Sequence, residues 1–148
     1  MHNILYSLRF KLIIWFSRTH KTVLRISVGR LMQNILGLNM LLLSTRGRRT
    51  GQCRKTPLLY MKDGDKYYCV ASFAGSHKHP QWFLNLVANP NVHLLVKRRT
   101  LTAIAHVTSG QERDKAWAML VNYYPAYAKY QKRTERTIPV VRFDSVSH

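Results

Sequence analysis

The chain has 148 residues, of which 46% are hydrophobic and 20% are charged. It is therefore long and apolar enough to bury a core without disulfide or metal support, and its composition is not that of a disordered tail. Its 24 Lys and Arg outnumber its 6 Asp and Glu, and the formal net charge of +18 at pH 7 favours polyanionic partners such as nucleic acid, phosphorylated cofactors or an anionic membrane face.

The two cysteines do not form a disulfide framework or a zinc site, and they indicate reduced thiols in a cytoplasmic protein. His77 and His79 lack further metal-ligating residues nearby, so no metal site is predicted.

The first 38 residues differ from the rest of the chain and form a segment of their own, residues 1–38, without any Asp or Glu. Apolar residues recur there at helical spacing, with basic residues between and beyond them: Ile4, Leu5, Leu8, Leu12, Trp15 and Phe16. The apolar runs are shorter than the roughly 20 residues that a membrane span needs. The pattern predicts a basic amphipathic helix. It either lies peripherally on the inner face of the cell membrane, held by anionic lipid, or packs on the domain with its basic face outward.

Residues 39–148 read as one α+β domain dominated by short strands. Strands are expected at residues 40–45, 54–62, 66–72, 92–96, 101–107 and 138–143. A helix is expected to open at Pro80 and to end before Asn89, a capping box at 109–112 predicts the start of a second, and residues 126–133 predict a third. Because closure removes exposed strand edges, the economical architecture is a mainly antiparallel six-stranded β-barrel with inserted helices.

A basic loop joins the first two expected strands, between residues 44 and 56. It carries two glycines and five basic side chains: Arg46, Arg48, Arg49, Arg54 and Lys55. Glycine lets a backbone approach a ligand closely, and Arg and Lys donate to phosphate oxygens. The loop is either a grip for an anion or a solvated basic turn.

The sequence offers no order of Ser, His and Asp and no paired carboxylates for acid–base catalysis. If the protein is an enzyme, the difficult chemistry therefore belongs to a cofactor. Three segments can assemble around one: the basic loop, the strand end at residues 70–73, and the tyrosines Tyr124, Tyr127 and Tyr130. Each has a simpler interpretation as well, since Trp82 in the nearby helix and the tyrosines also fit a packed core.

Together these segments resemble the deazaflavin-dependent nitroreductases of the split-barrel flavin-binding superfamily. The matching stretches are residues 45–58, 70–75, 79–86, 88–90, 124–131 and 136–141, in the family's order and spacing. The resemblance implies a split β-barrel (FMN-binding split-barrel-like) that binds coenzyme F420, an 8-hydroxy-5-deazaflavin hydride carrier with a phosphodiester and an acidic tail. It leaves FMN as the less favoured cofactor.

Carried over by position, the resemblance also implies roles for individual residues. The phosphate and tail would be held by Arg48, Arg49, Thr50, Arg54 and Lys55. The ring system would be flanked by Thr56, Pro57, Leu58, Leu59, Val70, Ala71, Ser72 and Phe73. The coenzyme would also contact Gln81, Trp82, Phe83, Leu84, Asn85 and Tyr127. Substrate binding or proton supply would involve Ser72, Tyr124 and Tyr130.

The chain departs from the family pattern at Phe73, Ala74, Cys53 and Leu59. We therefore expect hydride transfer to a quinone-like or other activated hydrophobic acceptor rather than to nitroimidazoles. Related barrels often dimerise, so a homodimer is one option for the assembly. One alternative is a deazaflavin- or flavin-binding protein without fast turnover. An alternative of another class is a nucleic-acid-binding protein, prompted by the net charge and by the basic residues 97–99, although no known nucleic-acid-binding motif is recognisable.

Overall fold

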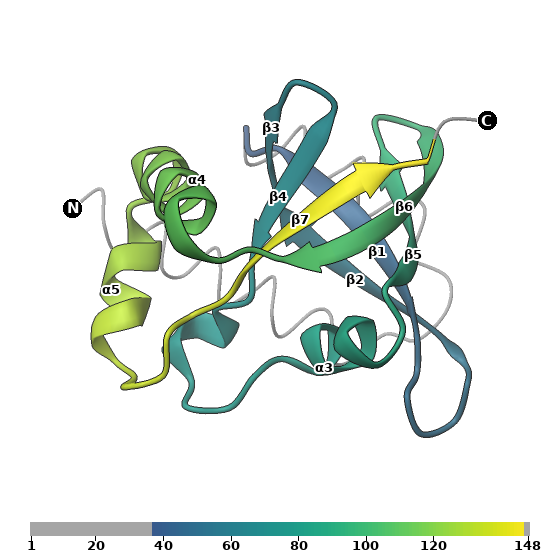
Figure 1. Ribbon diagram of the computed structural model, residues 1–148, viewed down its shortest axis with the longest axis horizontal. Helices are drawn as coiled ribbons and strands as arrows, with labels where there is room; N and C mark the ends of the chain where they lie inside the picture. The colour runs from purple at the N-terminus through teal and green to yellow at the C-terminus, as the bar shows by residue number, and fades with distance from the viewer. Residues whose placement is uncertain (1–36, 147–148) are drawn as a thin grey trace.

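The computed structural model describes residues 37–146, so the amphipathic helix predicted in the segment 1–38 lies outside the described residues. Figure 1 shows a curled antiparallel sheet with helices at its side and at one end. The strands are β1 (Met40–Arg46), β2 (Cys53–Leu59), β3 (Met61–Asp63), β4 (Lys66–Val70), β5 (Asn91–Val96), β6 (Arg99–Val107) and β7 (Val140–Ser145). The helices are the 3₁₀ turn η1 (Phe73–Gly75), α3 (Gln81–Ala88), α4 (Gly110–Tyr123) and α5 (Ala126–Lys132).

The strands form one sheet in the order β2-β1-β5-β6-β7-β4-β3, with antiparallel pairing throughout. This confirms the expected antiparallel architecture. The described part of the chain has seven strands rather than the expected six, because the predicted strand at 54–62 is divided at Tyr60. The Tyr60 N–H still donates to the Asn39 carbonyl at 3.0 Å, in register with the β1–β2 pairing, but from Met61 onward the chain pairs with β4, so β2 and β3 have different neighbours.

Both faces of β4 and of early β7 are covered, which explains the continuous apolar runs of these two strands. Alternate residues of a strand point to opposite faces. Two clusters of buried residues lie on the two faces: one packs against α3 and is called the inner core, and the other packs against α4 and α5 and is called the outer core. In β4, Cys69 belongs to the inner core and Val70 to the outer core. In β7, Phe143 and Val140 divide in the same way. A strand buried on both faces needs apolar residues at successive positions, not only at alternate ones.

The turn between β5 and β6 is tighter than the predicted four residues. Only Lys97 and Arg98 connect the strands, since Val96 already pairs with Arg99. Both connecting residues have positive φ, 46° and 68°, which is the combination of a type I′ turn. That turn matches the right-handed twist of the flanking strands, although neither residue is a glycine.

The predicted capping box at the start of α4 is wrong. Ser109 precedes the helix but makes no side-chain cap. The Glu112 carboxylate instead accepts a 2.6 Å hydrogen bond from Arg142 Nη1 and a 3.4 Å bond from the Tyr68 hydroxyl. A charge-assisted bond to a guanidinium is stronger than the reach back to a backbone amide, so Glu112 turns toward β4 and β7.

Both cysteines are free: Cys53 is exposed at the start of β2, and Cys69 is buried in the inner core. Among residues 37–146, no helix is long and apolar enough to cross a bilayer.

Candidate coenzyme site

The centre of the basic loop, residues 47–52 between β1 and β2, is a compact turn. The Gly47 N–H donates to the Gln52 carbonyl at 2.7 Å, and the Gly51 N–H donates to the Gly47 carbonyl at 2.8 Å. A side chain at Gly47 would meet Thr50 Oγ1 at 3.1 Å and Gln52 O at 3.2 Å, and Gly51 has φ +69°. The two glycines therefore serve the shape of the loop itself, one through space and the other through its backbone angle.

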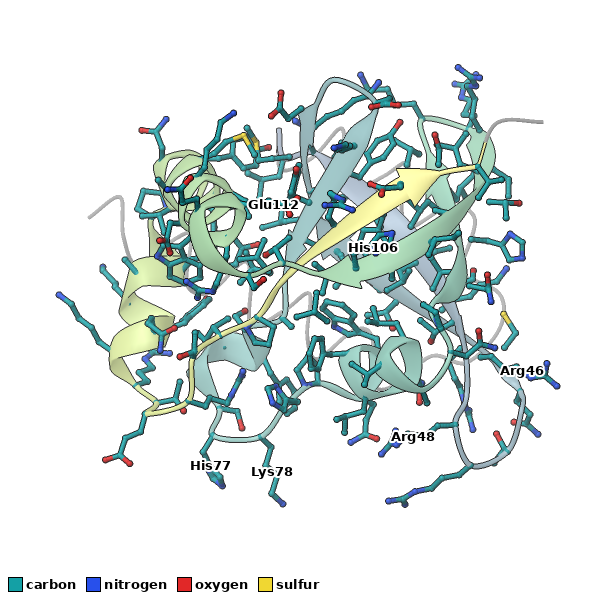
Figure 2. The ribbon with its side chains drawn as sticks, viewed as in Figure 1. Arg46, Arg48, His77, Lys78, His106 and Glu112 are labelled. Atoms are coloured by element: carbon teal, nitrogen blue, oxygen red, sulfur yellow. The ribbon has the colours of Figure 1, made fainter. Side chains whose placement is uncertain are left out.

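Arg48 fastens this loop to α3. Its backbone N–H and its Nη1 donate to Asn85 Oδ1 at 3.2 Å and 3.0 Å, and Nη1 also donates to Gln81 Oε1 at 3.0 Å. Asn85 is buried, and its amide nitrogen donates to Thr45 Oγ1 at 3.5 Å. Figure 2 shows Arg48 on the side of the loop that faces α3. The structure thus brings Arg48, Gln81 and Asn85 together, but it uses the Arg48 guanidinium to position the loop.

The other cations of the loop and of early β2 project into solvent. Arg46, Arg49, Arg54 and Lys55 are all exposed, and the neighbouring Thr50 is exposed as well. No carboxylate within residues 37–146 neutralises these cations. Each ion pair in the described part of the chain joins an acidic residue to a basic residue elsewhere, namely His106, Arg113, Lys115 or Arg142. Figure 2 shows His106 and Glu112 away from Arg46 and Arg48. Arginine guanidinium groups and a lysine ammonium group without acidic partners form a set of hydrogen-bond donors that fits a phosphodiester with an acidic tail.

The strand end at residues 70–73 is tightly constrained. Ala71 and Ser72 are buried, and the Ala71 N–H donates to the Pro139 carbonyl at 2.9 Å. The next two residues, Phe73 and Ala74, have φ of 46° and 53°, a region that favours glycine. Phe73 is 38% exposed. The departure noted in the sequence therefore coincides with a strained backbone.

Arg136 is a functional candidate that the sequence reasoning missed. Its Nε donates to Ser76 O at 2.8 Å, its Nη2 donates to Ser72 O at 2.9 Å and to Ala71 O at 3.3 Å, and its Nη1 lies 3.3 Å from His79 Nδ1. Burial, and then the charge of Arg136, lowers the pKa of His79. Arg136 stands in a matching stretch of the sequence, but nothing local indicates contacts with a loop 57 to 65 residues earlier.

The three tyrosines form a packed cluster and do not line an open groove. Tyr124 is the C-cap residue of α4, while Tyr127 and Tyr130 belong to α5. Their exposures are only 3%, 2% and 5%, and the Tyr127 ring lies 5.0 Å from that of Tyr124 and 6.3 Å from that of Tyr130. Burial raises the pKa of all three phenols, and the side chains of Tyr124 and Tyr130 share a hydrogen bond.

The tyrosine segment nevertheless adjoins the strand end. A Cβ built on Gly75 would lie 2.6 Å from the Tyr130 carbonyl oxygen, so the backbones of η1 and α5 are in direct contact. In Figure 1 the β1–β2 loop, α3, η1 and α5 follow one edge of the molecule. The three segments singled out in the sequence therefore lie along a common edge.

The remaining predicted site residues divide between a half-buried rim and the core. Thr56, Pro57, Leu58 and Leu84 are half-buried. Leu59 lies in the outer core, whereas Trp82 and Phe83 lie in the inner core. For the two aromatic residues of α3, the structure thus favours the packing role that the sequence also allowed.

A curled antiparallel sheet with an exposed cationic loop fixed on α3, and with a strained turn after β4, fits a split-barrel coenzyme-binding protein. The model of the F420H(2)-dependent quinone reductase family matches residues 15–144. The chain belongs to this family. The resemblance inferred from the sequence motifs is thereby confirmed.

Similar proteins agree with this assignment. An F420H(2)-dependent quinone reductase of Mycobacterium tuberculosis is 39% identical over 128 residues, which cover 84% of this chain and 86% of that protein. The solved structure of an F420-H2 dependent reductase, FDR-A, is 37% identical with a TM-score of 0.67, and the match covers 72% of this chain and 94% of that one. A solved domain-swapped dimer is 33% identical with a TM-score of 0.67, covering 82% and 96% of the two chains.

Proposed function

We propose that this chain is an oxidoreductase that uses reduced coenzyme F420 to reduce a quinone-like or other activated hydrophobic acceptor. The observation that carries the proposal is the cationic loop, which Arg48 fastens to α3 while Arg49, Arg54 and Lys55 face solvent. Membership of the F420H(2)-dependent quinone reductase family supports the same coenzyme and the same reaction class. When bound, the reduced coenzyme supplies a hydride, which leaves the protein the tasks of binding, orientation and proton supply.

In this proposal the exposed cations Arg49, Arg54 and Lys55, with the Thr50 hydroxyl, hold the phosphodiester and the acidic tail. The rest of the loop needs no rearrangement, because Arg48, Gln81 and Asn85 already fix it on α3. A preorganised set of donors binds an anion with a smaller loss of conformational freedom than a mobile one.

The half-buried residues of β2 and the strand end at 70–73 would flank the ring system. Ser72 is our first candidate for the hydrogen bond to the acceptor oxygen, because it is the second residue after β4 and its carbonyl is held by Arg136 at 2.9 Å. A hydroxyl aimed at the oxygen on which negative charge develops stabilises the transition state more than the ground state. Tyr124 and Tyr130 are buried to a similar extent as Ser72 and hydrogen-bond to each other, so we place them second to Ser72 in this role.

A coenzyme titration tests the binding part of the proposal. The fluorescence of oxidised coenzyme F420 is followed as protein is added, and single-stranded DNA is tested at the same salt concentrations. We expect coenzyme binding that Arg54→Ala with Lys55→Ala weakens more than tenfold. The matched control is Lys97→Ala with Arg98→Ala, which removes the same charge from the β5–β6 turn. This turn follows the end of β5, whereas the basic loop lies near its start. Tight, salt-sensitive DNA binding without coenzyme binding would favour the nucleic-acid alternative.

Turnover is tested with menadione as a model quinone, by following the appearance of oxidised coenzyme. Coenzyme binding without turnover of menadione or any other quinone tested would identify a deazaflavin-binding protein without fast catalysis. Such a result would refute the reductase reaction while leaving the binding site intact.

The proposal extends to two features of assembly and location. A solved domain-swapped dimer among the similar structures supports a homodimer, which light scattering would detect as twice the chain mass. The basic composition of residues 1–38 supports peripheral contact with an anionic membrane face. Flotation with phosphatidylglycerol vesicles tests this, and Arg9→Gln with Lys11→Gln and Arg18→Gln should release the protein. Equal flotation with neutral vesicles would refute an electrostatic contact.

A further inference from the structure

The turn that follows β4 holds two consecutive residues in an unfavourable conformation. Phe73 and Ala74 have φ of 46° and 53°, and Gly75 continues with φ +78°. Side chains with a Cβ rarely adopt this region, because the Cβ approaches the following carbonyl. Such a turn persists only where its surroundings determine it, and strained turns of this kind concentrate at functional sites.

Arg136 holds both ends of this turn with one side chain. Nη2 donates to the Ser72 carbonyl at 2.9 Å, just before the strained pair, and Nε donates to the Ser76 carbonyl at 2.8 Å, just after it. Nη2 also donates to the Ala71 carbonyl at 3.3 Å. The planar guanidinium carries five donors in a fixed fork, so it can hold several carbonyls at once.

The Arg136 backbone is itself anchored beneath the turn. Gln131 Nε2 donates to the Arg136 carbonyl at 2.8 Å, and the Ile138 N–H donates to Gln131 Oε1 at 2.9 Å. The Arg136 N–H donates to Thr134 Oγ1 at 3.3 Å. The guanidinium therefore starts from a fixed point between α5 and β7.

We propose that Arg136 is a positioning residue that sets the Ser72 end of β4 and the 73–76 turn in the geometry required for hydride transfer. The inference rests on the proposed function, because it assigns Ser72 to the reacting end of the coenzyme site. Arg136 acts through the carbonyls of Ala71, Ser72 and Ser76. It is distinct from the cations of the basic loop, which bind the other end of the coenzyme.

The first experiment uses the protein alone, so it does not depend on the coenzyme. The N–H groups of Gly75 and Ser76 close the turn by donating to Ser72 O and Phe73 O, both at 3.0 Å. We expect Arg136→Ala to accelerate hydrogen exchange at these two amides at least tenfold. The matched control is Arg133→Ala, which removes the same charge, a 3.3 Å bond to the Ala74 carbonyl and a cation–π contact with Tyr130, but no bond to either end of the turn. It should change the two rates less than threefold.

The second experiment separates positioning from folding. Arg136→Ala should lower kcat at least tenfold and change the coenzyme Kd less than threefold, because the tail is held by the basic loop. Arg136→Lys keeps the charge but concentrates its donors on one nitrogen, so kcat should stay at least fivefold low. This variant, with its thermal midpoint recorded, replaces Arg136→Ala if the latter does not fold.

A double-mutant cycle tests whether the effect acts through Ser72. In a Ser72→Ala background, Arg136→Ala should lower kcat less than threefold, because coupled residues do not act additively. Additive losses, or an Arg136→Ala kcat within threefold of the parent, would overturn the proposal. If the parent protein neither binds coenzyme nor turns over, the proposed function fails, and the exchange rates still decide whether Arg136 holds the turn.

Discussion

Replacing Gly75 by alanine tests how closely η1 is packed on α5. The added Cβ would lie 2.6 Å from the Tyr130 carbonyl oxygen and 3.0 Å from both Tyr130 Cα and Arg133 Cβ. Overpacking of this kind costs about 1–3 kcal/mol. The φ of +78° adds about 1–2 kcal/mol for a residue with a Cβ. We therefore expect a loss of about 2–5 kcal/mol in the free energy of unfolding, or roughly 2–4 °C in Tm for each kcal/mol.

The matched control is Gly64→Ala in the turn between β3 and β4. Gly64 also has positive φ, +62°, but nothing lies within 4 Å of the added Cβ. It should therefore carry only the backbone cost of about 1–2 kcal/mol. Urea unfolding of both variants, followed by circular dichroism, gives the comparison. If Gly75→Ala loses no more stability than Gly64→Ala, then η1 and α5 are not in backbone contact, and the argument that joins the tyrosines to the strand end fails.

Two further predictions concern the cysteines and the β5–β6 turn. Native protein should react with one equivalent of a thiol reagent and denatured protein with two. The reason is that Cys53 is exposed, whereas Cys69 is buried and its burial raises the pKa of its thiol. Two fast equivalents in the native state would contradict the burial of Cys69. Lys97→Asn with Arg98→Gly should raise the free energy of unfolding by about 1 kcal/mol, because Asn-Gly suits the positive φ of a type I′ turn; a lower urea midpoint would show that the turn is not of this type.

The main elements of the barrel could be predicted from local patterns. Apolar runs placed β1, β4 and β7 close to their positions, because burial on both faces leaves a continuous apolar signal. The alternation of buried and exposed residues placed β5 and β6. Pro80 placed the start of α3 because its fixed φ and missing N–H suit a helix start. The division at Tyr60 could not be predicted, since it depends on a change of neighbouring strand, from β1 before Tyr60 to β4 after it. The failed capping box has the same origin, because Arg142 lies 30 residues after Glu112 in the chain.

The candidate site shows the same contrast between composition and placement. The sequence indicated the basic loop and its glycines, since charge and backbone freedom are properties of the residues themselves. It did not indicate that Arg48 would turn away from the other cations to bond Gln81 and Asn85, because α3 approaches the loop only in the folded chain. The sequence indicated that the three tyrosines either line the site or pack in the core. It did not indicate that α5 packs directly on η1 at Gly75, because that contact exists only in the folded chain.

By itself, the sequence determined the antiparallel barrel, the family and the chemical character of the cationic loop. These follow from hydrophobic periodicity, from motifs at fixed spacing and from charge, all of which are local. Only the tertiary structure decided which cation of the loop is bonded to α3 and which residues hold the site in shape. Arg136 gained its place because folding brings one guanidinium within hydrogen-bond distance of carbonyls on both sides of a strained turn. No local pattern records such a contact.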